Sequence, residues 1–192
     1  MKFSNEKHIL EIAKKADAKE IKRIAVINDM MADVSDDVKA NIDSAIAKLG
    51  VEVVNIDSSV IASSRPAWNL LMSAELCNNV SRYDGVKYGH RAEKFSGIDE
   101  LYTNSRTETF GEALKMAILF GSEALSTENY MPVYDKALRI RRVICEKFAE
   151  IFASYGAVLM PVCSKTAYTE NDVKENKYIC FDEAAYIAPA SI

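Results

Sequence analysis

The sequence predicts an α/β fold that is rich in helix and contains a small parallel or mixed sheet. Residues 24–56 follow a strand–helix–strand pattern with short links, which is typical of a βαβ unit with parallel strands and a right-handed crossover. Residues 66–155 carry apolar side chains mostly at helical spacing. A short apolar run over residues 157–160 ends at Pro161 and indicates a third strand.

The first third of the chain alternates helical and strand patterns. A helix is predicted after Ser4, a suitable N-cap, and its apolar residues are Ile9, Ile12, Ala13 and Ala16. Residues 24–27 are a short apolar run that suits a buried strand. Ser35 followed by Asp36 and Asp37 predicts the start of a second helix, because acids favour the positive end of the helix dipole. Its inward stripe is predicted to be Val38, Ile42, Ala45, Ile46 and Leu49.

Glycines and apolar residues at helical spacing predict the elements that follow along the chain. Gly50 predicts the end of the second helix, and residues 51–56 then form the second strand. Residues 96–99 form a candidate capping box before a short helix. The next helix presents Phe110, Leu114, Ile118, Gly121 and Leu125 on one face, where the small Gly121 and Ser122 would let a neighbour approach closely. The longest helix is predicted from near Pro132 to Gly156, with a stripe of Ala137, Ile140, Ile144, Phe148, Ile151 and Tyr155.

Length and composition limit the class of protein. The chain has 192 residues, which fits a single domain spanning residues 1–192, and its net charge of −4 argues against direct nucleic-acid binding. The first twenty residues are polar and charged, and no run approaches the roughly 18 apolar residues of a membrane span. The four cysteines, Cys77, Cys145, Cys163 and Cys180, form no CxxC pair, so we expect reduced thiols in the cytoplasm. Only two histidines are present, and we expect no metal and no cofactor.

Candidate reactive groups are few. Cys163 lies just beyond a predicted strand, where α/β proteins place active groups, but nothing in the sequence ties it to His90, so a buried structural thiol is favoured. The serine pairs 58–59 and 63–64 have no glycine beside them to form an oxyanion hole, and both indicate solvated loops. A basic cluster on the longest helix could bind an anion, although a solvated or ion-paired face is favoured; it comprises Arg139, Arg141, Arg142 and Lys147.

Residues 82–89, Arg-Tyr-Asp-Gly-Val-Lys-Tyr-Gly, are unusually dense in tyrosine and charge for a turn. Asp-Gly favours a turn by itself, so one interpretation is a tight reversal in which tyrosine hydroxyls bond nearby carbonyls. The segment also resembles the R-[YF]-D-G-V-[RK]-Y-G segment of the amidase signature family, with Arg82, Tyr83, Asp84, Gly85 and Tyr88 at its characteristic positions. More narrowly, it is similar to the A subunits of glutamyl-tRNA(Gln) amidotransferases.

The resemblance continues through residues 105–115, 121–137 and 158–161, and covers about residues 20–190. It implies a partial amidase-signature domain that corresponds to the C-terminal part of the family fold. The family's nucleophilic serine, second serine and lysine lie upstream of the part resembled, so we expect this chain to lack them. Three substrate-binding positions also differ: the resemblance puts Trp68 in place of a tyrosine, Ala117 in place of an arginine, and Ala184 in place of an aspartate, although Asp182 and Glu183 lie close by.

Two functions are compatible with this pattern. The first is a non-catalytic relative that works through association, either as a homo-oligomer or with a chain that completes the sheet, because a sheet of three strands leaves two unpaired edges. The alternative is the C-terminal component of a split glutamine-dependent amidotransferase, which transamidates misacylated tRNA with a nucleophile on another chain. An inert truncated product that still folds is a third interpretation. We expect no amidase activity from this chain alone.

Overall fold

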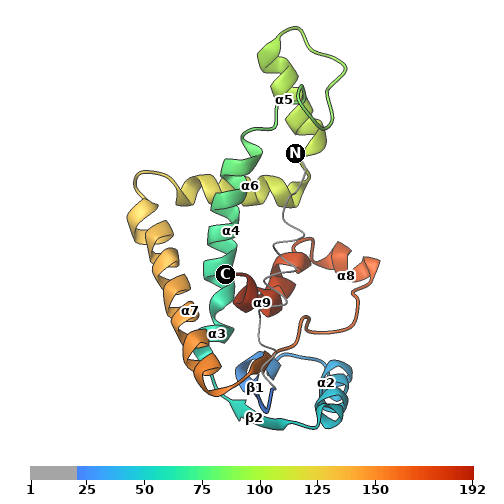
Figure 1. The fold of residues 1–192 in the computed structure, drawn as a ribbon. Helices are drawn as coiled ribbons and strands as arrows, with labels where there is room; N and C mark the ends of the chain where they lie inside the picture. The colour runs from blue at the N-terminus through green and yellow to red at the C-terminus, as the bar shows by residue number, and fades with distance from the viewer. Residues whose placement is uncertain (1–20) are drawn as a thin grey trace, which may run out of the picture.

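The structure, a computed structural model, describes residues 21–192 and contains one parallel sheet of three strands (Figure 1). β1 (Arg23–Ile27) lies between β2 (Glu52–Ile56) and β3 (Ala157–Leu159), which gives the order β2-β1-β3. In this register Ala25 of β1 stands opposite both Val54 and Val158. The predicted α/β class, the parallel βαβ unit and the third strand are therefore confirmed. The helix predicted after Ser4 lies outside the described residues.

Helices make up most of the remaining chain. They are η1 (Asn28–Met31), α2 (Asp36–Leu49), α3 (Ser59–Ala62), α4 (Ser64–Val80), α5 (Ile98–Thr109), α6 (Glu112–Ala124), the π-helical η2 (Tyr130–Asp135), α7 (Lys136–Ser154), α8 (Glu170–Glu175) and α9 (Ile179–Ser191). Within residues 21–192, no helix is long and apolar enough to cross a membrane.

Several predicted helix ends need correction. The longest helix does not begin near Pro132, because residues 130–135 form a π-helical turn and α7 starts at Lys136. The expected capping box at residues 96–99 is also wrong, because the N-cap of α5 is Gly97 and not Ser96. The backbone N–H of Ser96 instead donates to Glu100 Oε2 at 2.7 Å. Gly50 ends α2 in the left-handed region with φ 63°, as predicted.

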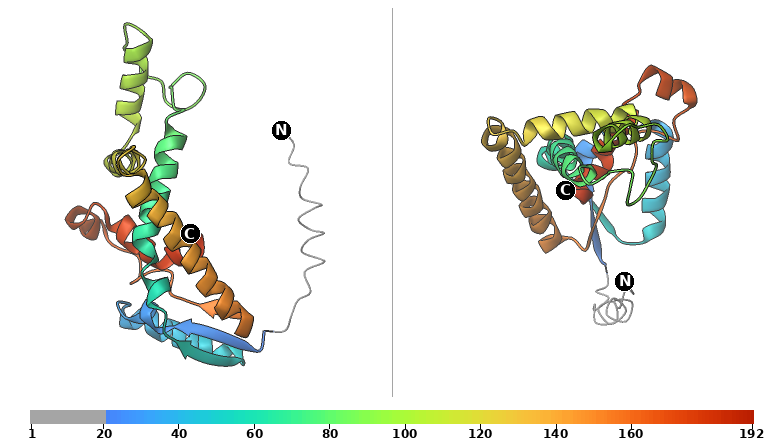
Figure 2. Two further views of the ribbon diagram at one scale, coloured as in Figure 1. Left: turned by 90° about the vertical axis from the view of Figure 1, so that its left-hand side faces the viewer. Right: turned by 90° about the horizontal axis from the view of Figure 1, so that it is seen from above.

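The sheet lies at one end of the molecule and α5 at the other (Figures 1 and 2). α4 runs between them, α6 crosses α4, and α7 runs beside α4 back towards β3 (Figure 2). The main core sits against β1 and comprises Ala25, Ile27, Met30, Ile61 and Ile151. A second, smaller cluster joins α4, α6 and α7 through Leu70, Ala124 and Ala137.

Two predicted apolar stripes are less buried than their spacing indicates. No residue of α2 is buried, and Leu49 at its end is 46% exposed. On α7, Ala137, Ile144 and Ile151 are buried as expected, but Ile140 is 39% exposed. Helical spacing identifies the face that turns inward, but burial also requires enough neighbouring structure to cover that face.

Gly121 is the point at which α4 and α6 come closest. A Cβ at this position would overlap the carbonyl group of Ser73 on α4, well inside van der Waals contact. Both Gly121 and Ser73 are buried, whereas Ser122 is exposed and its hydroxyl donates to the carbonyl oxygen of Leu119. The close approach predicted for this pair of small residues is therefore confirmed at Gly121 and does not extend to Ser122.

We expect Gly121→Ala to destabilise the fold by about 2 kcal/mol or more, because the methyl group meets backbone atoms that cannot rotate away. Denaturant unfolding measures this loss. Gly111→Ala is the matched control, since Gly111 precedes the same helix with open space around it, and its cost should stay below about 1 kcal/mol. Equal stability of the two variants would contradict the close contact.

Candidate functional site

The segment singled out by the sequence forms a tight loop between α4 and α5, here called the Asp84 loop (residues 81–92). Asp84 Oδ1 accepts hydrogen bonds from the backbone N–H groups of Val86 at 2.8 Å and Lys87 at 3.0 Å. These bonds, with that from Lys87 the stronger influence, hold the pKa of Asp84 below its ordinary value of 3.8. The carboxylate therefore serves to fold the loop on itself.

The two glycines of the loop permit contacts that a side chain would block. Gly85 has φ +68°, and a Cβ there would lie 2.5 Å from the hydroxyl oxygen of Ser105 on α5. That hydroxyl is buried and accepts a hydrogen bond from the backbone N–H of Ala92 at 3.0 Å. Gly89 has φ +78° and lies against the ring of Tyr83. The left-handed backbone therefore lets Gly85 pack directly against α5 and Gly89 pack against the Tyr83 ring within the loop.

Aromatic and guanidinium groups complete the attachment of the loop. The Tyr83 hydroxyl donates to the carbonyl oxygen of His90 at 3.0 Å, and its ring meets the Tyr88 ring edge-on with centroids 5.7 Å apart. Arg106 of α5 donates through Nε to the carbonyl oxygen of Tyr83 at 2.8 Å and through Nη2 to that of Ser81 at 2.9 Å. The interpretation of a tight reversal with a tyrosine hydroxyl bonded to a carbonyl is confirmed.

The three positions that the resemblance assigns to substrate binding are not brought together in one of the cavities described here. Trp68 lines a cavity of about 330 Å³ with Glu75, Tyr134 and Arg141, whereas Ala117 lines another of about 290 Å³ between α4, α6 and the start of α9. Ala184 is buried in α9 with 4% of its surface exposed. Among the described residues, no cation lines the cavity at Ala117, so a carboxylate there would have no bidentate partner.

Asn69 is a site residue that sequence reasoning missed. It lines the Ala117 cavity together with Ser73 and Phe181, whereas its neighbour Trp68 lines the other cavity. Within the part of the chain that the structure describes, its Oδ1 atom is buried without a hydrogen-bond partner. Consecutive side chains of a helix project about 100° apart. Trp68 and its neighbour Asn69 on α4 therefore face different cavities.

The acids near Ala184 are engaged in structural bonds. Asp182 pairs with Arg65 at 3.0 Å and accepts from the Asn176 amide at 2.8 Å. Glu183 accepts from the backbone N–H of Ser164 at 2.9 Å and from its hydroxyl at 2.5 Å. Both carboxylates therefore connect α9 to other parts of the fold, Asp182 to α4 and Glu183 to the segment after β3.

Polar groups also gather at the carboxyl ends of β1 and β2, where open α/β sheets place ligands. The Asn28 amide donates to Asp57 Oδ1 at 3.0 Å, and the backbone N–H of Ser58 donates to Asp29 Oδ2 at 2.5 Å. These bonds join the two strand ends to each other. No group of three or more potential metal-binding side chains occurs within residues 21–192.

The cysteine and histidine candidates lie at opposite ends of the molecule. His90 Nε2 is 2.5 Å from Glu108 Oε2 on α5, at the end far from the sheet (Figure 1). Cys163 follows β3 and is a half-buried free thiol, like Cys77, while Cys145 and Cys180 are exposed. An imidazole at the far end of the fold cannot activate the Cys163 thiol.

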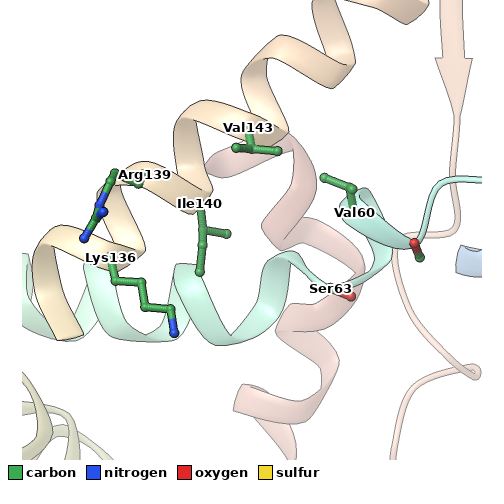
Figure 3. Close-up of a pocket in the computed structure, with 7 residues that line it drawn as sticks. Val60, Ser63, Lys136, Arg139, Ile140 and Val143 are labelled. Carbon is green, nitrogen blue, oxygen red and sulfur yellow. The ribbon is translucent and has the colours of Figure 1, made fainter. Parts of the chain in front are cut away.

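The serine pairs separate into buried and groove-lining members. Ser58 and Ser64 are buried, and their hydroxyl oxygens have no partner among the described residues, which corrects the expectation that both pairs form solvated loops. Ser59 and Ser63 line a groove of about 520 Å³ that Lys136 also borders (Figure 3). Across residues 21–192, no hydrogen bond joins Lys136 to either hydroxyl, and no glycine-rich turn adjoins the groove to supply oxyanion donors.

The basic cluster on α7 is largely ion-paired, as interpreted. Arg139 pairs with Asp135, Arg142 with Glu146 and Lys147 with Glu150, each at 2.9 Å. Arg141 instead lines the Trp68 cavity. Exposed pairs of this kind one helical turn apart neutralise charge and contribute little stability.

Comparison with known proteins identifies relatives that all belong to one family. The family model described as Amidase matches residues 4–191. The A subunit of the glutamyl-tRNA(Gln) amidotransferase from Campylobacter lari is 39% identical over 165 residues, which are 84% of this chain and 36% of that protein. The corresponding protein of Ruminiclostridium cellulolyticum is 38% identical over 137 residues, covering 71% of this chain and 28% of that protein.

A solved structure shares the fold. The crystal structure of the A subunit of the glutamyl-tRNA(Gln) amidotransferase from Thermotoga maritima superposes with a TM-score of 0.56 at 22% identity, over 88% of this chain and 33% of that chain. The chain thus spans about a third of the length of the curated relatives it matches. The expected partial amidase-signature fold is confirmed.

The Asp84 loop should show a pH transition of known sign. Because the folded pKa of Asp84 is lowered, its stabilising bonds are complete above the ordinary pKa of 3.8 and are lost as the pH falls through the lower folded value. An NMR titration should show the amide protons of Val86 and Lys87 shifting together below pH 3.8. Asp84→Asn should abolish this transition, whereas a midpoint above 3.8 would contradict the described bonds.

Proposed function

Because the chain belongs to the amidase family, we propose that it is a non-catalytic, single-domain relative that acts through association. The observation that supports this function is an exposed apolar surface on α6. Met116, Leu119 and Phe120 occur at helical spacing and are 48%, 64% and 50% exposed. Contiguous exposed apolar residues of this size mark protein interaction surfaces.

The lack of catalytic groups supports the first half of the proposal. Within the 192 residues the seven glycines stand singly, so no glycine- and serine-rich nucleophile segment is present. The Ala117 cavity is lined by apolar and neutral groups. A carboxylate-bearing substrate would lose its solvation in this cavity without gaining a charged partner.

We propose that the occupant of the α6 surface is a second copy of the chain. Met116, Leu119 and Phe120 form a ridge, and Leu119 also lines a neighbouring groove of about 510 Å³, whose other lining residues are Cys77, Val80, Ser81, Arg106, Phe110, Lys115 and Ile118. A ridge next to a groove is self-complementary under a twofold axis, since the ridge of each copy can enter the groove of the other.

The alternative is the C-terminal component of a split glutamine-dependent amidotransferase. The similarity to proteins named as A subunits favours it, because those names imply partner chains. In this case another chain would carry the nucleophile, and the present chain would complete the substrate site. Ala117 weighs against this alternative, because among the described residues no arginine lines its cavity to bind the glutamine carboxylate.

Association through α6 predicts a concentration-dependent dimer of about twice the 21.4 kDa chain mass in light scattering. Leu119→Glu should shift the protein to monomer, because it places a charge at the centre of the apolar ridge. Val162→Glu is the matched control, since Val162 is 73% exposed on a different segment, and it should leave the mass unchanged. A wild-type monomer at all concentrations would contradict self-association through this surface.

The proposed non-catalytic role predicts that the purified chain releases no ammonia from glutamine above the buffer blank. Ala117→Arg should not change this result, because an added arginine supplies binding without a nucleophile. Activity that appears only when a second chain with a glycine- and serine-rich segment is added would favour the split enzyme. Activity of the chain by itself would overturn both proposals.

A further inference from the structure

The groove between α3 and α7, here called the α3–α7 groove, lies apart from α6 and from the Asp84 loop. It is a hollow of about 520 Å³, within the usual size of small-molecule sites. Its lining comes from α3, from the residue that follows α3, and from α7: Ser59, Val60, Ser63, Lys136, Arg139, Ile140 and Val143.

Charge is concentrated at one end of this groove. Lys136 and Arg139 lie on the first turn of α7, and in Figure 3 their nitrogen-bearing ends point in different directions, that of Lys136 below Ile140 and that of Arg139 to its left. Arg139 Nε is 2.9 Å from Asp135 Oδ2, so that cation is partly neutralised. Lys136 makes no ion pair within residues 21–192, which leaves one uncompensated positive charge at this end.

Apart from Ser59 and Ser63, the rest of the groove is lined by aliphatic side chains. Ile140, Val143 and Val60 follow one another away from the cations in Figure 3. Their exposed fractions are 39%, 51% and 39%, which is high for branched aliphatic side chains that face a hollow. The Ser63 hydroxyl lies beneath this apolar strip (Figure 3).

We propose that the α3–α7 groove binds a linear amphiphilic anion, an alkyl chain of medium length that ends in a carboxylate or phosphate. The anionic head would lie beside Lys136, where the uncompensated charge stands. The alkyl chain would cover Ile140, Val143 and Val60 and remove their aliphatic surface from water. This assignment does not rest on the proposed function of the α6 surface.

Decanoate, decyl phosphate, decanol, hexanoate and acetate are the probes, the amphiphilic anions used below their micelle concentrations and decanol below its solubility limit. Calorimetry should show saturable binding of one decanoate per chain, and each methylene group between hexanoate and decanoate should strengthen binding about two- to fourfold. Acetate should not bind measurably. Decanol should bind at least about fivefold more weakly than decanoate, because it has no charge for Lys136. Comparison of decanoate with decyl phosphate identifies the preferred head group.

Lys136→Met keeps the length of the side chain and removes its charge. It should weaken decanoate binding about tenfold and leave decanol binding unchanged. Arg142→Met is the matched control, because Arg142 lies on the same helix, pairs with Glu146 and does not line the groove. Val143→Asp should abolish binding of both probes, and circular dichroism should show that all three variants retain the helical content of the wild type.

Three results would overturn the proposal. One is no saturable decanoate binding, and another is equal affinity for decanol and decanoate. The third is an equal effect of Lys136→Met and Arg142→Met, which would show that binding occurs at a different surface, such as the groove beside α6.

Discussion

The close crossing of α4 and α6 is the contact on which the positions of the other helices depend. Gly121 rests against the carbonyl group of Ser73, so the two helix backbones meet with no side chain between them. Leu70, Ala124 and Ala137 then pack beside this crossing and bring α7 against α4. Because α4 runs from the sheet to the Asp84 loop, a shift in this crossing would move the loop, the α6 ridge and the Ala117 cavity together.

The most recognisable motif of the chain has a structural role in this molecule. The hydrogen bonds described for the Asp84 loop join it to itself, to the end of α4 or to α5. These bonds attach the loop to α5 through the Ser105 hydroxyl and the Arg106 guanidinium, and none of them involves a nucleophile. Membership of the family therefore establishes the fold and not the activity, and the side chains that line the cavities carry the information about function.

The sequence predicted the fold better than it predicted the site. Hydrophobic spacing located the three strands, α2, α6 and most of α7, whereas α4 was covered only by the general helical pattern of residues 66–155. The π-helical turn at residues 130–135 gave no signal in spacing, since apolar and aromatic residues there suit either helix type. The sequence does not indicate Asn69, because apolar spacing does not tell which of the adjacent residues Trp68 and Asn69 faces the Ala117 cavity. The α3–α7 groove was hidden as well, because its cations and its Ser63 hydroxyl come from segments far apart along the chain.

The order of the sheet has a consequence for how the chain acquires its structure. β1 is both the first strand along the described chain and the central one, and its second neighbour, β3, is made only after α7. During synthesis one edge of β1 must therefore remain open while every intervening helix emerges from the ribosome. Pairings so distant in sequence form slowly and leave apolar strands accessible to other nascent chains. The chain should accordingly depend more on chaperones than its small size indicates.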